Sequence, residues 1–114
     1  MNRPAAKSVQ RRFLMAFGRA VYATWPVLTT ILAAQVALGL LIGFVEGWSF
    51  GDALYFTFVT GLTIGYGDIV PRQSLTRALA LVIGFAGILL TGLAAAIAVY
   101  AMRAALTDRD QHKR

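Results

Sequence analysis

The chain has 114 residues, of which 58% are hydrophobic and only 14% are charged. Soluble domains are about half apolar and about a quarter charged, so this composition argues against an ordinary soluble domain. The net charge of +6 is compatible with nucleic-acid binding. Basic residues beside membrane spans are explained more simply by the membrane topology of the chain and by contact with anionic lipid headgroups. We therefore expect a membrane protein with no nucleic-acid partner. The chain has no cysteine, so disulfide and thiolate chemistry do not enter the argument.

Residues 1–19 form a basic segment that we expect to be cytoplasmic or interfacial. It contains five basic side chains and no acidic one: Arg3, Lys7, Arg11, Arg12 and Arg19. Apolar side chains recur every four residues through this segment and into the next: Val9, Phe13, Phe17 and Val21. This spacing predicts an interfacial helix; a disordered basic tail that becomes ordered near Phe13 is the alternative. A cleaved signal peptide would have a much shorter apolar core than the one that follows.

Residues 20–45 carry no charge and exceed the roughly 20 apolar residues that cross a membrane as a helix, so they are the predicted outer helix. Gly39, Gly43 and Gly47 repeat at four-residue spacing. Such a bare face lets a neighbouring backbone approach closely, which indicates helix packing. For Gln35 in the same span we favour one interhelical hydrogen bond over the lining of a polar path.

Residues 49–61 are apolar but too few to cross a hydrocarbon core about 30 Å thick. We expect them to enter and leave through the same face of the membrane. Ser49 or Asp52 can cap a short helix over residues 50–61, and Gly61 allows that helix to end. This segment is the predicted pore helix.

Residues 63–68 read Thr-Ile-Gly-Tyr-Gly-Asp. Backbone that is not helical survives at membrane depth only against protein or water. Gly65 and Gly67 can adopt positive φ, so successive carbonyl groups can point to one side. If the carbonyls of residues 63–66 and the Thr63 hydroxyl replace water around a cation, one copy cannot enclose it. Several chains must then supply matching rings around a closed symmetry axis, which predicts an oligomeric ion pore.

Residues 78–102 are a second uncharged stretch, from which we expect an inner helix over 76–103 and a short cytoplasmic tail over 104–114. Small residues dominate the second half of this helix, which favours an inner gate that opens easily. Thr91 either lines a water-filled cavity or bonds back to the carbonyl of Gly87.

Charge placement predicts the orientation. The segment between the spans, residues 46–77, carries three acidic and two basic side chains, while the remaining basic residues lie near the two ends. Those after the second span are Arg103, Arg109, Lys113 and Arg114. Since basic residues favour the cytoplasmic side, we expect both termini to be cytoplasmic and the protein to lie in the plasma membrane.

The stretch from Thr60 to Pro71, Thr-Gly-Leu-Thr-Ile-Gly-Tyr-Gly-Asp-Ile-Val-Pro, resembles the signature of the potassium channel pore-domain family, whose filter is built from backbone carbonyls. The resemblance covers nearly the whole chain. It implies an all-α membrane protein of the two-transmembrane type, with a re-entrant pore helix and an extended selectivity filter, assembled as a homotetramer. The implied filter residues are Thr63, Ile64, Gly65, Tyr66 and Gly67, with K⁺ held at the first four.

Further positions match the family one by one. Tyr55 and Phe56 resemble an aromatic cuff that supports the filter, although simple filling of a helix interface explains them too. Arg77 resembles a basic residue at the outer start of the inner helix, or is a snorkelling anchor. Gly87 stands where similar channels have a gating hinge, or serves packing. Asp68 lies at the outer mouth.

The sequence departs from the family pattern in two places. Residues 60–63 read Thr-Gly-Leu-Thr where the family usually has Thr-Leu-Thr-Thr, so one hydroxyl near the filter base is missing, which we expect to affect filter stability rather than selectivity. Val59 stands where some relatives hold a carboxylate that pairs with the acid matching Asp68. Asp68 must therefore find another partner or remain solvated as part of an acidic ring.

The sequence thus predicts a potassium-selective channel that conducts passively and is not an enzyme. We expect no cofactor, with K⁺ as the permeant ion, and anionic lipid headgroups as partners of the basic ends. A nonselective cation channel on the same scaffold and a nonconducting membrane adaptor are the alternatives. The gating stimulus, the conductance and the existence of a regulatory subunit are left open.

Overall fold

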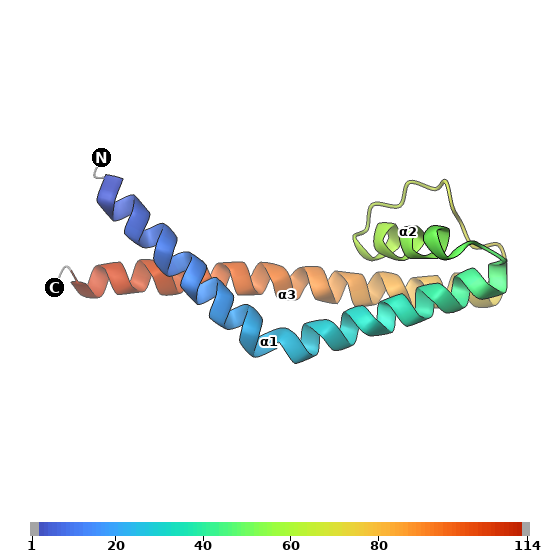
Figure 1. The fold of residues 1–114 in the computed structure, drawn as a ribbon, viewed down its shortest axis with the longest axis horizontal. Helices are drawn as coiled ribbons and strands as arrows, with labels where there is room; N and C mark the ends of the chain where they lie inside the picture. The colour runs from blue at the N-terminus through green and yellow to red at the C-terminus, as the bar shows by residue number, and fades with distance from the viewer. Residues whose placement is uncertain (1–2, 113–114) are drawn as a thin grey trace. The chain divides into compact units, whose positions relative to one another are not determined.

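The computed structural model describes the backbone of residues 3–112 and the side chains of residues 6–107. Lys113 and Arg114 and the side chains of Arg3 and Arg109 lie outside this part. The described backbone forms three helices: α1 (Arg3–Glu46), α2 (Phe50–Gly61) and α3 (Ser74–His112) (Figure 1). α1 and α3 are each long and apolar enough to cross a membrane. The predicted all-helical fold with two candidate spans is confirmed.

Both long helices extend beyond the expected spans. Residues 3–19 continue into the outer span as one helix, so the alternative of a disordered tail does not apply to them. Pro4 stands in the first turn of α1, where its missing N–H costs no helical bond. α3 likewise continues through residues 104–112, because no glycine or proline follows Gly92 in it.

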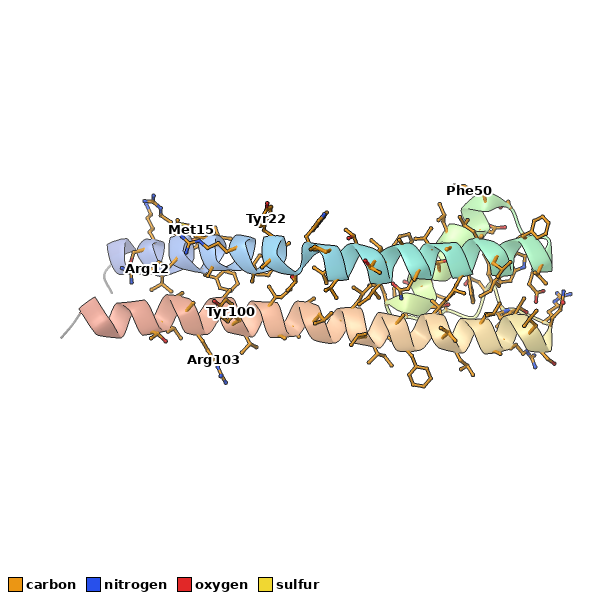
Figure 2. All side chains as sticks on the ribbon, turned by 90° about the horizontal axis from the view of Figure 1, so that it is seen from below. Arg12, Met15, Tyr22, Phe50, Tyr100 and Arg103 are labelled. Carbon is orange, nitrogen blue, oxygen red and sulfur yellow. The ribbon has the colours of Figure 1, made fainter. Side chains whose placement is uncertain are left out.

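The chain divides into two compact units. The first, here called the terminal unit, joins Met1–Pro26 to Leu93–Arg114. The ends of α1 and α3 lie at the same end of this unit (Figures 1 and 2). Ala101 and Ala105 of α3 are buried in it, whereas Met15 and Tyr22 point away from α3 (Figure 2). The terminal unit is thus a pair of helices with small residues buried in it.

The second unit, Val27–Gly92, is here called the filter unit. Each of its three helices contributes one side chain to its core: Ile42 from α1, Phe56 from α2 and Ile83 from α3. The ring of Trp48 meets Phe56 edge to face at 5.0 Å between centroids, a favourable aromatic geometry. This core fixes α2 against both long helices.

The glycine face of α1 receives α2. A Cβ atom on Gly39 would lie 1.6 Å from the Thr57 hydroxyl oxygen, and one on Gly43 would lie 2.5 Å from the Ala53 Cβ. The predicted packing role of these two glycines is therefore confirmed. Gly47 has a different role, because its φ of 76° places it outside the helix, where it ends α1.

A carboxylate joins the end of α1 to the start of α3. Oε1 of Glu46 accepts hydrogen bonds from the backbone N–H groups of Arg72 and Gln73, at 2.9 and 3.0 Å. The Thr76 hydroxyl donates to the same oxygen. Thr76 is completely buried, so this contact fixes the segment that returns from the filter to α3.

Candidate ion-conducting site

α2 positions the segment that follows it. Ser49 is the N-cap, and its side chain accepts a hydrogen bond of 3.2 Å from the N–H of Asp52. At the other end, the N–H groups of Ile64 and Gly65 both point to the carbonyl of Val59, at 2.9 and 3.4 Å. Helix termini leave carbonyls without helical partners, and here the filter segment supplies donors for them. The base of residues 63–68 is therefore attached directly to α2.

The backbone of residues 63–67 alternates in conformation. Thr63, Gly65 and Gly67 have positive φ angles of 60°, 62° and 82°, and Ile64 and Tyr66 between them do not. In a strand, successive carbonyls point to opposite sides, whereas alternation between left- and right-handed conformations turns successive peptide units the same way. The two glycines were predicted to adopt this conformation. Thr63 was not, and positive φ is uncommon for a residue with a side chain.

The carbonyl groups of this ribbon are left free within one chain. No hydrogen bond found among residues 3–112 uses the carbonyl oxygen of residues 63–67 as acceptor. The Thr63 hydroxyl donates to the Leu62 carbonyl at 2.6 Å, which leaves its own oxygen lone pairs available. Tyr66 is 67% exposed in the single chain. The carbonyl oxygens of this exposed segment are therefore available to groups outside the chain.

Asp68 has a partner that the sequence did not reveal. The hydroxyl of Tyr55 on α2 donates to its Oδ2 at 2.9 Å. The apolar side chain of Val59 has no group that could hydrogen-bond to Asp68. The hydrogen bond thus connects α2 to the C-terminal end of residues 63–68, as the Val59 carbonyl connects it to the N-terminal end.

The two aromatic residues of the predicted cuff have different surroundings. Phe56 belongs to the core of the filter unit and is only 6% exposed, which is the interface-filling role. Tyr55 contacts Asp68. Both also line a cavity of about 180 Å³ between α2 and the filter segment, together with Gly65 and Gly67. The structure therefore places both residues beside the segment of residues 63–68.

Replacement of Tyr55 by Phe is expected to shorten the time for which the filter conducts. The change removes one hydroxyl and its bond to Asp68, so the outer end of the filter loses its attachment to α2 while the carbonyl row is retained. In voltage-clamped bilayers, K⁺ current should decline several-fold faster than in the wild type, with unchanged selectivity against Na⁺. Tyr22→Phe is the control, since Tyr22 is 84% exposed. Equal rates of decline in the two variants would count against this role for Tyr55.

α3 contacts α2 at Gly87. A Cβ atom on Gly87 would lie 2.0 Å from the carbonyl oxygen of Gly61, so α3 touches the backbone of α2 there. Of the two roles expected for Gly87, packing and hinge, this contact supports packing. Thr91 borders a small cavity with Gln35 and Thr57. Within the described residues its hydroxyl has no bond to the Gly87 carbonyl, unlike Thr57, which donates to Ala53 four residues earlier.

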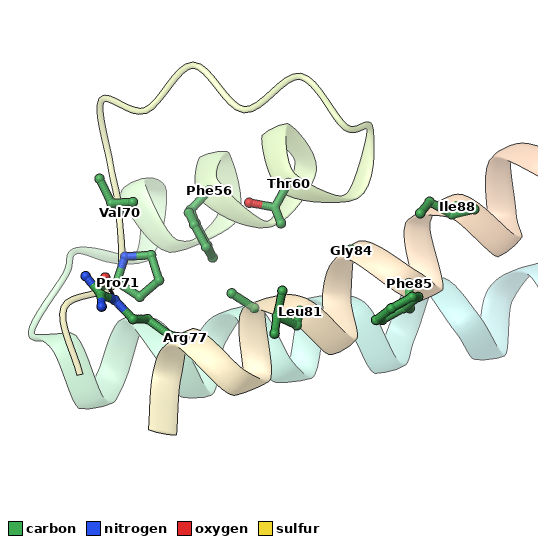
Figure 3. Close-up of a pocket in the computed structure, with 10 residues that line it drawn as sticks. Phe56, Thr60, Val70, Pro71, Arg77, Leu81, Gly84, Phe85 and Ile88 are labelled. Carbon is green, nitrogen blue, oxygen red and sulfur yellow. Dashed lines mark hydrogen bonds between the residues drawn. The ribbon is translucent and has the colours of Figure 1, made fainter. Parts of the chain in front are cut away.

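Arg77 lies at the start of α3, where its Nε donates to the carbonyl of Pro71 at 3.3 Å. The side chain borders a groove of about 530 Å³ between α3 and the segment made of α2 and the loop after the filter. Figure 3 shows that Phe56 and Thr60 face this groove from α2, while Leu81 and Phe85 face it from α3. The groove is apolar apart from Arg77 and Thr60.

Comparison with known proteins identifies the class. A family model described as an ion channel matches residues 26–104. This is more than half of the chain, and the chain therefore belongs to this ion channel family. A membrane channel, rather than an enzyme, is the class that the spans and the family together define.

The relatives are potassium channels. Two-pore potassium channel 1 of Arabidopsis thaliana is 54% identical over 41 residues, which are 36% of this chain and 11% of the relative. Potassium channel subfamily K member 13 of Rattus norvegicus is 34% identical over 74 residues, 64% of this chain and 18% of the relative. Member 12 of the same subfamily and organism is 62% identical over 29 residues, 25% of this chain and 7% of the relative.

The chain therefore spans less than a fifth of the length of these relatives. No solved structure matches it. The resemblance to the potassium channel pore-domain family, carried by residues 60–71, is nevertheless confirmed by the family model and the relatives.

Sequence reasoning missed two contacts that hold this site. The sequence analysis treated Glu46 only as one of the acidic residues between the spans. A carboxylate at the end of one helix can, however, accept hydrogen bonds from the free backbone N–H groups near the start of another helix. The bond from Tyr55 to Asp68 had a weaker signal, because it joins residues thirteen positions apart across an irregular segment.

Proposed function

We propose that this chain forms a homotetrameric, potassium-selective channel in the plasma membrane, with both termini in the cytoplasm. The observation that carries the proposal is the row of unused carbonyl groups in residues 63–67, whose φ angles alternate in sign. Four such rows around one axis would replace the water shell of K⁺, which then moves down its electrochemical gradient. The names of the relatives as potassium channels support K⁺ as the ion.

The surface of the subunit supports assembly within a membrane. Phe44 and Phe85, both in the filter unit, are 85% and 73% exposed. Large apolar side chains left open in this way are typical of surfaces that meet lipid or another subunit. In the proposed tetramer, the four Asp68 carboxylates surround the outer mouth and raise the local concentration of cations.

The roles of the individual residues follow from this arrangement. K⁺ is coordinated by the carbonyls of Thr63, Ile64, Gly65 and Tyr66, and by the Thr63 hydroxyl oxygen. Gly67 completes the alternating backbone. The basic N-terminal segment contacts anionic headgroups of the inner leaflet. No soluble cofactor takes part.

Ion flux from proteoliposomes tests the proposal. Purified protein should release K⁺ from loaded vesicles much faster than it releases Na⁺ under an equal gradient, and empty vesicles should release neither. Equal rates for the two ions would identify a nonselective cation channel on the same scaffold and refute K⁺ selectivity. Absence of any protein-dependent flux would favour a nonconducting membrane adaptor.

A further inference from the structure

A groove of about 460 Å³ lies between α1 and α3 in the terminal unit. Three of the residues that line it are alanines, whose small side chains leave the space open. Ile97 is only 7% exposed, so the groove reaches down to a side chain that is buried between the two helices. The lining residues are Arg19, Ala20, Ala23 and Thr24 of α1 and Leu93, Ala96, Ile97 and Tyr100 of α3.

The groove is polar at one end and apolar along the rest. The ends of α1 and α3 lie at the same end of the terminal unit (Figure 1), so Arg19 and Tyr100, the lining residues nearest to those ends, lie at the same end of the groove. Tyr100 points from α3 toward α1, whereas Arg103 points away from it (Figure 2). The hydroxyl of Thr24 is already used within α1, since it donates to the Ala20 carbonyl at 2.7 Å.

The polar end of the groove coincides with the boundary of the uncharged stretches. Arg19 is the last charged residue before residues 20–45, and Arg103 is the first after residues 78–102. The rest of the groove therefore runs along the part of each helix that carries no charge. In the proposed orientation, the polar end lies at the cytoplasmic interface and the apolar part extends into the hydrocarbon core.

The two spans offer no anion to Arg19. The acidic residues of the chain are Glu46, Asp52, Asp68, Asp108 and Asp110. None of them lies in residues 1–45 or 69–107, so the span of a neighbouring copy brings no carboxylate to the groove either. Basic pockets between membrane helices on the cytoplasmic side bind anionic lipid headgroups. A phospholipid supplies both a phosphate for the guanidinium and an acyl chain for the apolar part.

We propose that this groove binds one anionic phospholipid of the inner leaflet in each subunit. The phosphate accepts hydrogen bonds from the Arg19 guanidinium and the Tyr100 hydroxyl, and one acyl chain lies along the alanines and Leu93. A zwitterionic headgroup fits less well, because its cationic group would approach residues 1–19, which contain five basic side chains and no acidic one. The assignment to the inner leaflet rests on the proposed function, which places both termini in the cytoplasm, whereas the binding itself does not depend on conduction.

Native mass spectrometry of the detergent-purified oligomer tests the proposal. Dioleoylphosphatidylglycerol and dioleoylphosphatidylcholine, which have the same acyl chains, are added in equal amounts. We expect the wild type to retain up to one phosphatidylglycerol molecule per subunit and several-fold less phosphatidylcholine.

Arg19→Gln should lower the apparent affinity for phosphatidylglycerol by about fivefold, because one basic side chain near an anionic headgroup contributes roughly that factor to binding. Arg103→Gln is the matched control. It removes the same charge from the end of the other span, but Arg103 points away from α1 (Figure 2), so the affinity should remain that of the wild type.

Ala23→Leu separates a built groove from a diffuse basic surface. Ala23 is exposed, so leucine at this position fills the apolar part of the groove without displacing the core of the unit and without changing any charge. Retention of phosphatidylglycerol should fall several-fold although Arg19 is intact.

Three outcomes overturn the inference: equal retention of the two lipids by the wild type, equal effects of Arg19→Gln and Arg103→Gln, and unchanged retention in Ala23→Leu. The second would assign the lipid preference to diffuse surface charge, and the third would leave the groove to a neighbouring subunit. Should Ala23→Leu fail to assemble, the comparison of the two arginine variants decides the question. Because lipid retention is measured without ion flux, its failure leaves the proposed channel intact, and absence of flux leaves the lipid result intact.

Discussion

Gly65→Ala and Gly67→Ala are each expected to abolish K⁺-selective conduction. The two glycines have φ angles of 62° and 82°, and, apart from the adjacent residues, no atom of the described part of the chain lies within 4 Å of a Cβ atom placed on either. The expected defect is therefore backbone strain at positive φ, and not a clash of the added Cβ with other atoms of the same chain. An alanine in the left-handed region costs about 1–2 kcal/mol. A homotetramer would incur this cost four times, and relaxation of the backbone would turn carbonyls out of the row.

Proteoliposome flux measures this effect. The two variants should lose the difference between K⁺ and Na⁺ release, with no K⁺ release above that of empty vesicles or equal release of both ions. Gly18→Ala is the matched control, since Gly18 lies inside α1 and also has no atom within 4 Å of the added Cβ. It should conduct like the wild type. Unchanged K⁺ preference in both filter variants would show that residues 63–67 do not form the selective path.

Gly87→Ala is expected to destabilise the assembled protein strongly. The added Cβ would lie 2.0 Å from the Gly61 carbonyl oxygen and 2.6 Å from the carbonyl carbon. Both are backbone atoms, which cannot rotate away, so α3 and α2 must separate. Overpacking of this kind costs about 1–3 kcal/mol per site, and each subunit contains one such site. We expect the temperature at which the detergent-solubilised oligomer dissociates to fall by many degrees.

Two glycines of the same helix provide controls for this prediction. Gly84 and Gly92 lie on either side of Gly87 in α3, and a Cβ atom on either would meet nothing within 4 Å. Their replacement by alanine should leave the dissociation temperature unchanged or raise it slightly, because alanine favours helix over glycine by about 1 kcal/mol. A fall of the same size in all three variants would mean that helix flexibility, and not the contact with Gly61, determines stability.

The elements of this fold were predictable where one local property determines them. The absence of charge over residues 20–45 and 78–102 predicted the two spans, and residues 50–61 were predicted as a helix from their length and a cap at either Ser49 or Asp52. Positive φ at Gly65 and Gly67 followed from the residue type. The ends of α1 and α3 were less predictable, because the polar segments beyond the spans also favour helix once a neighbouring helix is present.

Features that depend on tertiary contacts were not predictable. Thr63 adopts a φ of 60° although its side chain disfavours positive φ, and in this conformation the N–H groups of residues 63–65 bond to the last turn of α2. The partner of Asp68 depends on how the filter segment lies over α2. A packing role was one of the two roles proposed for Gly87 from the sequence, but its contact with the Gly61 carbonyl was not foreseen. Gln35 was expected to make an interhelical bond, and the structure shows that bond to the Ile83 carbonyl.

In the proposed channel, main-chain carbonyls of four subunits replace the water around K⁺. Anomalous diffraction from crystals of the purified protein in Rb⁺ or Tl⁺, which mimic K⁺, locates the bound ions. We expect a line of ion peaks on a fourfold axis, in direct contact with the carbonyl oxygens of Thr63, Ile64, Gly65 and Tyr66. A monomeric protein, or ions that remain hydrated and away from these oxygens, would refute this coordination.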